Sequence, residues 1–207
     1  MIQRRSPVAF KNQPLQTDTR EGWDVVLQYE DEGEGPFLID LTHLSKWDVQ
    51  HHDLSQIKTL GGKIPETPGD CVVQGGMLVG RLNRIQAVVW HLSTHGPQMP
   101  QEEALTDVTE ASALLALVGE SLFSIAEKIT ALDLSDPAKV APFLLQGPVL
   151  HLPVKVVVLG REDNHAALLL SCPRGYGQSF ADAILDAGSE WALRPAGEKP
   201  FSPWMEG

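Results

Sequence analysis

The chain has 207 residues, with 27 acidic and 16 basic side chains and a formal net charge of −11. This balance argues against a nucleic-acid or anionic-lipid surface, because both need a concentrated surplus of Lys and Arg. Hydrophobic residues make up 43% of the chain, too many for a disordered protein, so we expect one globular domain or two small intergrown ones.

Targeting signals and cysteine usage predict a cytoplasmic protein. The polar start Met1–Arg5 lacks the apolar core of a secretory signal. The longest apolar runs, such as 113–118 and 154–159, are far shorter than the ~20 residues that cross a bilayer. Cys71 and Cys172 lie far apart without metal-ligand spacing beside them, so we expect two buried thiols rather than a disulfide.

The first 50 residues predict an arm followed by strands. Residues 1–22 are polar and contain two prolines, which indicates an extended arm with little regular structure. Strand formers then fill 24–30 and 37–41, and the acidic turn 31–36 between them favours a hairpin. A short strand is expected at 47–50.

The next segment predicts a capped helical turn and a two-stranded unit. Asp53 has the side chain of an N-cap, and the helix that it begins is expected to end at Gly61-Gly62. The two strands are expected over 71–82 and 84–92. Gly75-Gly76, inside the first of them, indicates a bulge or a close backbone approach. Residues 94–103 are the best linker candidate.

The second half alternates strands with amphipathic helices. Leu122, Ile125, Ala126, Ile129 and Leu132 share one helical face, and a second helix ends at Gly188. The expected elements are strands over 106–117, 154–159 and 166–171 and helices over 122–132 and 180–187. This strand–helix–strand–strand–helix order predicts an α+β fold with a ferredoxin-like split βαβ unit.

Common catalytic and cofactor motifs are absent from the sequence. Neither GxGxxG nor GxxxxGK[ST] occurs, which argues against a classical nucleotide loop. The sequence also lacks the G-x-S-x-G nucleophile elbow. Ser121 follows Gly119-Glu120 at a helix start, where capping is the simpler role. No catalytic residue and no metal site is therefore expected.

The histidines form three local clusters, and for each a functional role is weighed against a structural or solvent-exposed one. His91 and His95 have zinc-ligand spacing, but a turn separates them and a solvated loop is favoured. His51-His52-Asp53 indicates capping and exposure. His43 follows Asp40 by three positions, which leaves open a buried hydrogen-bonded pair or an acid–base dyad without a nucleophile.

The five tryptophans are scattered, as core or interface anchors are. Trp204 lies with Phe201 in a Pro-rich tail. The tail either docks against a partner or folds on its own domain, and the sequence leaves both open.

Four segments taken in order resemble the glycine cleavage T protein (aminomethyltransferase) family. Residues 40–50, DLTHLSKWDVQ, resemble its D-x-[ST]-x-x-x-K-x-x-V-x-G segment with His51 in place of the closing Gly. Residues 76–90 resemble its V-x-R-L hairpin, and 108–119 its V-T-D…L-A-L stretch. Residues 172–197 resemble its V-P…G-x-x-P-x-G close.

Within this folate-binding superfamily the chain is most similar to the gamma subunits of heterotetrameric sarcosine oxidases. The resemblance implies two intergrown α+β subdomains, including the ferredoxin-like unit, as in the N-terminal part of the T protein. We therefore expect an extended arm over 1–22, a folate-binding-like domain over 23–197 and a Pro-rich tail over 198–207.

The chain departs from the family where the family binds folate. Gly75-Gly76 stands where folate-using members carry an acidic pair, and Leu169 replaces the Glu that holds the pterin. Glycine and leucine supply no carboxylate for either task. If folate does bind, the low-ranking pocket candidates are Arg81, Arg161 and Glu162.

The resemblance and its departures favour a non-catalytic subunit. We expect it to assemble with larger sarcosine oxidase-type subunits that carry FAD, FMN and NAD and oxidise an N-methyl amino acid. The chain alone is expected to bind no cofactor, with tetrahydrofolate as the remaining possibility. The alternative is a stand-alone tetrahydrofolate-dependent aminomethyl- or methyltransferase-like protein.

Overall fold

The computed structural model describes residues 3–57, 63–94, 98–162 and 165–205. Within these residues the chain is built mainly of strands, with few helices. The strands are β1 (Pro14–Arg20), β2 (Trp23–Tyr29), β3 (Phe37–Asp40), β4 (Lys46–Gln50), β5 (Cys71–Gln74), β6 (Met77–Arg81), β7 (Gln86–His91), β8 (Leu105–Asp107), β9 (Ser112–Val118), β10 (Phe143–Val149), β11 (Leu152–Glu162), β12 (His165–Pro173) and β13 (Arg194–Ala196). The helices are α1 (Leu122–Ile129) and α2 (Gly177–Ala187), with 3-10 turns η1 (Leu54–Gln56), η2 (Arg174–Tyr176), η3 (Ser189–Trp191) and η4 (Lys199–Trp204).

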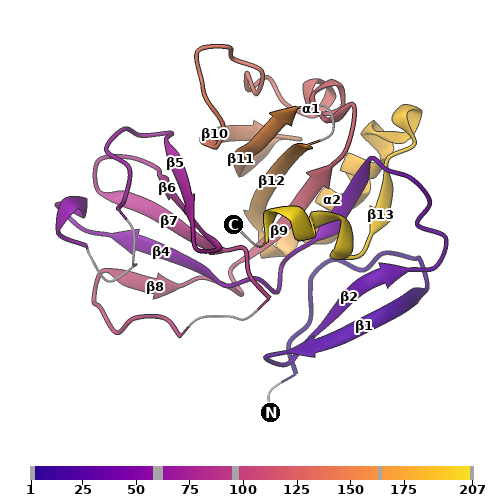
Figure 1. The fold of residues 1–207 in the computed structure, drawn as a ribbon, viewed down its shortest axis with the longest axis horizontal. Coiled ribbons are helices and arrows are strands. Elements are labelled where there is room, and N and C mark those ends of the chain that lie inside the picture. Colours follow the sequence, from indigo (N-terminus) through magenta and orange to yellow (C-terminus); the bar gives the residue numbers. More distant parts are fainter. Residues whose placement is uncertain (1–2, 58–62, 95–97, 163–164, 206–207) are drawn as a thin grey trace.

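The strands form three sheets (Figure 1). A six-stranded sheet has the order β10-β11-β12-β9-β3-β13, and a five-stranded sheet has the order β5-β6-β7-β4-β8. β1 and β2 form a separate antiparallel ribbon. Among the strands of the described residues all pairings are antiparallel except that of β13 with β3; an isolated bridge between Arg4 and Trp23 is also parallel. The mixed α+β class predicted from the sequence is confirmed.

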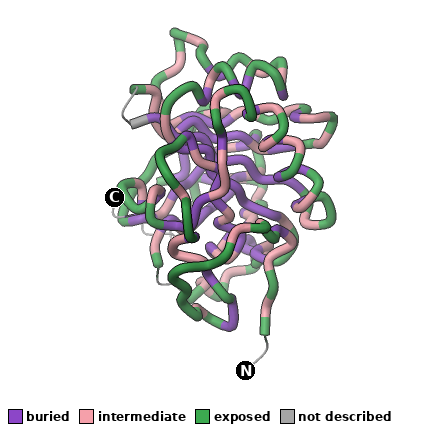
Figure 2. Tube along the Cα trace, turned by 90° about the vertical axis from the view of Figure 1, so that its right-hand side faces the viewer, coloured by how far each residue is buried: buried purple, intermediate pink, exposed green. Residues whose placement is uncertain are grey.

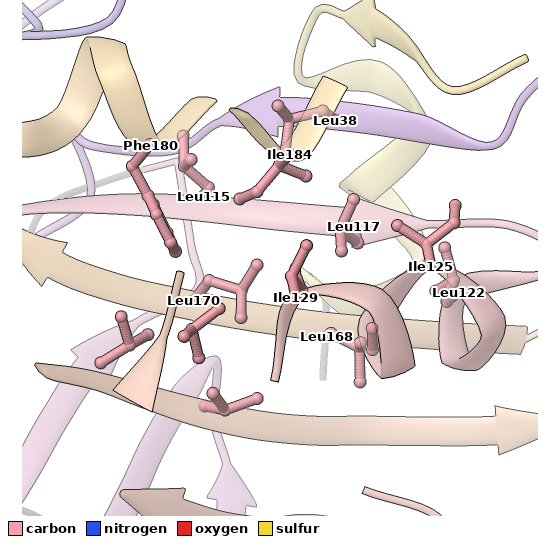
Figure 3. Packing of buried hydrophobic residues seen from close by; sticks show 14 of the residues in the cluster. Leu38, Leu115, Leu117, Leu122, Ile125, Ile129, Leu168, Leu170, Phe180 and Ile184 are labelled. Atoms are coloured by element: carbon pink, nitrogen blue, oxygen red, sulfur yellow. The ribbon is translucent and has the colours of Figure 1, made fainter. Parts of the chain in front are cut away.

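Both faces of the six-stranded sheet are covered. Strand β9 reads Ala-Leu-Leu-Ala-Leu-Val after its first residue, and successive side chains point to opposite faces. Leu115 and Leu117 pack under α1 and α2, as Figure 3 shows. Leu114 and Ala116 face the other way and pack against Leu78 and other residues of the five-stranded sheet. A continuous apolar strand is therefore required here.

The far face of the five-stranded sheet carries a third apolar cluster. Trp47, Val49 and Val89 pack there against the loop residues Leu54 and Ile64. Figure 2 shows the buried positions gathered in the middle of the molecule, with exposed backbone around them. The resulting order of layers is helices, six-stranded sheet, five-stranded sheet and covering loops.

The N-terminal strands pair differently from the prediction. The hairpin expected between 24–30 and 37–41 is wrong, because β2 pairs with β1 and β3 joins the six-stranded sheet. Strand β1 was not expected at all. It is polar and almost entirely exposed, so no apolar alternation marks it, and it is ordered by its pairing with β2.

Two of the predicted strands each correspond to two separate strands in the structure. Residues 71–82 contain β5 and β6, and Gly75-Gly76 is the tight turn between them rather than a bulge. Residues 106–117 contain β8 and β9, which belong to different sheets. Strands β10 and β13 were not predicted, because prolines and a glycine interrupt their apolar pattern.

Both amphipathic helices are confirmed, with small differences at their ends. The first spans Leu122–Ile129, so Leu132 lies beyond it, and the second is followed by Gly188. Ser121 does not cap with its side chain; it has a left-handed φ of 61° and makes no side-chain cap bond. Asp53 does cap, accepting a hydrogen bond from Ser55 N, but Gly61-Gly62 lies outside the described residues.

The expectation of two buried thiols is confirmed. Cys71 and Cys172 are free and buried, and burial raises the pKa of their thiols to about 12 and about 11 respectively. In the described part of the chain, no helix combines the length and the apolar character that a membrane span needs.

Candidate functional site

Neither position that the family resemblance singled out, Gly75-Gly76 or Leu169, places a polar side chain in a pocket. Gly75 and Gly76 form the β5–β6 turn with φ angles of +57° and +69°. A Cβ on Gly76 would lie 3.3 Å from Ser93 Cβ and 3.7 Å from the carbonyl of Met205. Leu169 lies between Ala116 and Val157 in the sheet and is fully buried in the apolar layer.

Arg81, a pocket candidate, holds loops together. Its guanidinium donates to the carbonyl oxygens of Asn83 (3.0 Å), Pro65 (3.0 Å) and Arg84 (2.8 Å). Because Nε, Nη1 and Nη2 each have a backbone acceptor, this side chain joins the β6–β7 turn to the segment before β5. Arg81 therefore has a structural role, which the sequence alone could not show.

Arg161 and Glu162 end strand β11 and behave differently. Arg161 Nη1 donates to the carbonyl of Asp136 at 2.9 Å, and its Cζ lies 4.7 Å from the centre of the Phe143 ring. Arg161 Nε and Nη2 are buried and have no hydrogen-bond partner among the residues that the structure describes. Glu162 is exposed. The structure does not bring Arg81 and Arg161 into one binding site, although each contacts a residue of the same groove.

That groove, which we call the β5 groove, has a volume of about 640 Å³. It lies between β5 and the segment that precedes β10, and residues 63, 65, 66, 70–72, 138–140, 142 and 143 line it. Pro65, held by Arg81, forms part of one wall. Phe143, under Arg161, forms part of the other. The groove between the contacts of these two arginines was not predicted from the sequence.

A second polar cluster joins both ends of the described chain. The carboxylate of Glu198 lies 3.0 Å from His43 Nε2 and 2.7 Å from Arg20 Nη1, and Arg20 Nε also pairs with Asp18 at 2.8 Å. The sequence left open a hydrogen-bonded pair of His43 with Asp40. In the structure His43 pairs with Glu198 instead, and Asp40 Oδ1 accepts the N–H of Thr42.

Lys46 is fully buried within the segment that resembles the T protein family. Its Nζ donates to the carbonyls of Thr42 at 2.8 Å and Leu44 at 2.9 Å. Burial lowers the pKa of Lys46 to about 7, and the nearby Asp40 and Asp107 carboxylates offset only part of that effect. The lysine closes the turn that follows β3 and faces no groove.

The remaining candidate residues have structural surroundings. His91 packs its ring 5.3 Å from that of Trp47, and burial lowers the pKa of His91, while His95 lies outside the described residues. No group of three or more metal-ligating side chains occurs among the described residues. Phe201 is fully buried and stacks on Trp204 at 5.7 Å, so the tail folds on its own domain.

Comparison with known proteins connects this fold to sarcosine oxidase. No protein-family model matches the chain. A stretch of 104 residues is 35% identical to the sarcosine oxidase subunit alpha of Rhizobium meliloti (strain 1021), covering 47% of this chain and 10% of that protein. The chain thus spans about a tenth of the length of this relative.

A solved structure gives the fold-level likeness. The chain resembles a chain of the heterotetrameric sarcosine oxidase from Corynebacterium sp. U-96, solved in complex with pyrrole 2-carboxylate. The TM-score is 0.61 at 13% identity, over 75% of this chain and 84% of that one. The two chains therefore have similar lengths and the same overall fold.

Proposed function

We propose that this chain is a small, non-catalytic subunit of a sarcosine oxidase-type assembly, comparable to its gamma subunit. The observation that carries the proposal is the fold match to a chain of similar length within a heterotetrameric sarcosine oxidase. The 35% identity to part of an alpha subunit supports the same association. The resemblance rests on fold and partial sequence, so the function follows by analogy.

The sheet order supports the ferredoxin-like unit within this proposal. In the six-stranded sheet, β9 lies beside β12 and β12 beside β11, with α1 and α2 on one face. Strand β13 lies at the far edge, with β3 inserted between it and β9. This order supports the proposal of a split βαβ unit into which one strand of the other subdomain enters.

The residues present do not fit tetrahydrofolate as the family holds it. Gly75-Gly76 is a tight turn without a carboxylate, and Leu169 is sealed in the core. Arg81 is already bonded to three backbone carbonyls. We infer that FAD, FMN and NAD, and the oxidation of an N-methyl amino acid, belong to larger partner subunits. This chain contributes surface to them.

Co-expression tests the subunit assignment. The tagged chain is produced with the larger sarcosine oxidase-type subunits of its own source, and size-exclusion chromatography follows flavin absorbance. We expect the chain to elute with the flavin in fixed stoichiometry. Elution as a separate species at micromolar concentrations of both would contradict the proposal.

Calorimetry tests the alternative of a stand-alone folate-dependent transferase. Tetrahydrofolate is titrated into the wild type and into Arg161→Ala. We expect no binding in the micromolar range for either protein. Micromolar binding that Arg161→Ala weakens at least tenfold would favour the transferase instead.

A further inference from the structure

The chain crosses between the two larger sheets at two neighbouring points. Residues 41–45 lead from β3 in the six-stranded sheet to β4 in the five-stranded sheet, and residues 108–111 lead back from β8 to β9. Lys46 N donates to Thr109 Oγ1 at 3.0 Å, and Val108 N donates to the Lys46 carbonyl at 2.9 Å. Lys46 therefore lies where the two crossings are bonded to each other.

The side chain of Lys46 closes the first crossing, residues 41–45, which we call the crossover turn. The residue is fully buried, and its Nζ donates to the carbonyls of Thr42 and Leu44 at 2.8 and 2.9 Å. In the described part of the chain, no carboxylate lies within ion-pair distance of this nitrogen. A neutral amine has two N–H donors, which these two acceptors satisfy, whereas an ammonium has a third. The hydrogen-bond geometry therefore fits the neutral amine.

The charged groups packed around Lys46 do not make up for its burial. Asp40 at the end of β3 and Asp107 at the end of β8 favour the protonated form, while Arg174 in η2 opposes it. Burial is the largest effect and lowers the pKa of Lys46 to about 7. His43, in the crossover turn itself, directs its Nε2 to a different carboxylate at 3.0 Å. A proton taken up by Lys46 as pH falls therefore creates a buried ammonium without a bonded counter-ion.

The crossover turn borders a route for water. His43, Leu44 and Ser45 line one side of a small cavity of about 20 Å³, which has room for about one water molecule. His43 and Ser45 are partly exposed, whereas Leu44 is buried. Because Leu44 both lines this cavity and accepts a hydrogen bond from Nζ, an outward movement of the turn brings water to the amine.

We propose that the crossover turn is a pH-sensitive switch, closed while the Lys46 amine is neutral and opened when the amine takes up a proton. Opening carries His43 away from Glu198, whose carboxylate then keeps only Arg20 of its two cationic partners in the described chain. The switch couples a proton in the core to the contact that holds the C-terminal segment. It does not depend on the proposed subunit function.

Native-state hydrogen exchange, followed by NMR, tests the switch on the unmodified chain. The amides of Leu44, bonded to the Leu41 carbonyl, and of His91, bonded to the Ser45 carbonyl, report opening of the turn. Each opening takes up one proton, so we expect the opening constant, corrected for intrinsic exchange, to rise about tenfold from pH 8.5 to pH 7.5. Amides of β9 should open more rarely. If the turn amides open only together with those of β9, the turn has no opening of its own and the proposal is overturned.

The C-terminal segment reports the coupling. Phe201 N donates to the Glu198 carbonyl at 2.9 Å, so its protection should fall with that of the Leu44 amide as pH is lowered. Protection of Phe201 that stays constant while that of Leu44 falls would overturn the coupling to this segment.

Two variants separate Lys46 from His43. Lys46→Met keeps the apolar stem and removes the titration, so protection of the Leu44 amide should no longer depend on pH in this range. His43→Gln keeps a hydrogen-bond donor but cannot titrate, so the tenfold rise should remain. Loss of the pH dependence in His43→Gln, or its persistence in folded Lys46→Met, would overturn the proposal.

A direct measurement on the wild type does not require either variant to fold. In lysine-labelled protein, the ¹⁵N and ¹³C shifts of the Lys46 side chain distinguish an amine from an ammonium. We expect the amine at pH 8.5 and the ammonium at pH 6. An ammonium at pH 8.5 would show that the closed turn holds the charged form, which overturns the switch.

Discussion

His43 Nε2 lies 3.0 Å from Glu198 Oε1, and this contact joins residues 155 positions apart. The same carboxylate binds Arg20, so the N-terminal ribbon, the turn after β3 and the C-terminal segment meet at one buried charge. Phe201 and Met205, near the end of the described chain, pack among residues of the two larger sheets. The cluster therefore fixes both ends of the described chain to the core.

Glu198→Gln is expected to destabilise the protein by about 2–4 kcal/mol at pH 7, because it leaves the largely buried Arg20 guanidinium without this carboxylate. Burial raises the Glu198 pKa, but the hydrogen bonds and charges of His43 and Arg20 outweigh it and leave the pKa below 4.5. The stabilisation is thus complete above pH 4.5 and is lost as pH falls through the folded-state pKa. Urea unfolding at pH 7 and at pH 3.5 measures the difference.

The exposed end of the cluster supplies the control for Glu198→Gln. Asp18 pairs with the same arginine but its side chain is 48% exposed, so Asp18→Asn is expected to lower the free energy of unfolding much less than Glu198→Gln does. Equal losses for the two variants, or a pH dependence unchanged by Glu198→Gln, would contradict the role given to Glu198.

Local pattern explains which elements could be predicted. Both helices and the β9 core follow from apolar spacing within a few residues, and the Asp53 cap follows from its own side chain. Strand β1 carries no such pattern, because its side chains face solvent and its order comes from β2. A polar strand of this kind can be recognised only from its hydrogen bonding to a neighbouring strand in the structure.

The contacts of the candidate residues could not be predicted from the sequence. Arg81 and Arg161 were identified as candidates, yet their acceptors are backbone carbonyls, which no side-chain motif encodes. Glu198 was not identified, because its partners Arg20 and His43 lie 178 and 155 positions away. Long-range pairing of this kind depends on the finished fold.

Because Lys46 is buried, we expect the free energy of unfolding to rise with pH. Its folded-state pKa of about 7 lies below the ordinary value of 10.5, so between these values the unfolded chain holds a proton that the folded chain has released. Stability should then rise by up to about 1.4 kcal/mol per pH unit in this range. Lys46→Met removes this contribution. The unfolding free energy of the wild type minus that of the variant should therefore increase from pH 7 to pH 8.5. Parallel curves would show that Lys46 keeps its proton in the folded state.

The β5–β6 turn predicts unequal effects of two neighbouring substitutions. Both glycines have positive φ, but Gly76 is also within 3.3 Å of Ser93 at its virtual Cβ, whereas nothing lies within 4 Å of Gly75. Gly75→Asn should be nearly neutral, because asparagine accepts this turn conformation, and Gly76→Ala should cost about 1–2 kcal/mol. Thermal unfolding of both variants measures the contrast, and equal stability would show that the turn is not built as described.

The C-terminal segment predicts a large effect at Phe201 and a smaller one at Trp204. Phe201 is fully buried between the two larger sheets, so Phe201→Ala should cost about 3–5 kcal/mol through the cavity that it leaves. Trp204 is half-buried and stacks on Phe201, so Trp204→Ala should cost about 1–2 kcal/mol. Urea unfolding of the isolated chain distinguishes the two. If Phe201→Ala unfolds like the wild type, the segment does not complete the core, and its apolar side chains become available for a partner.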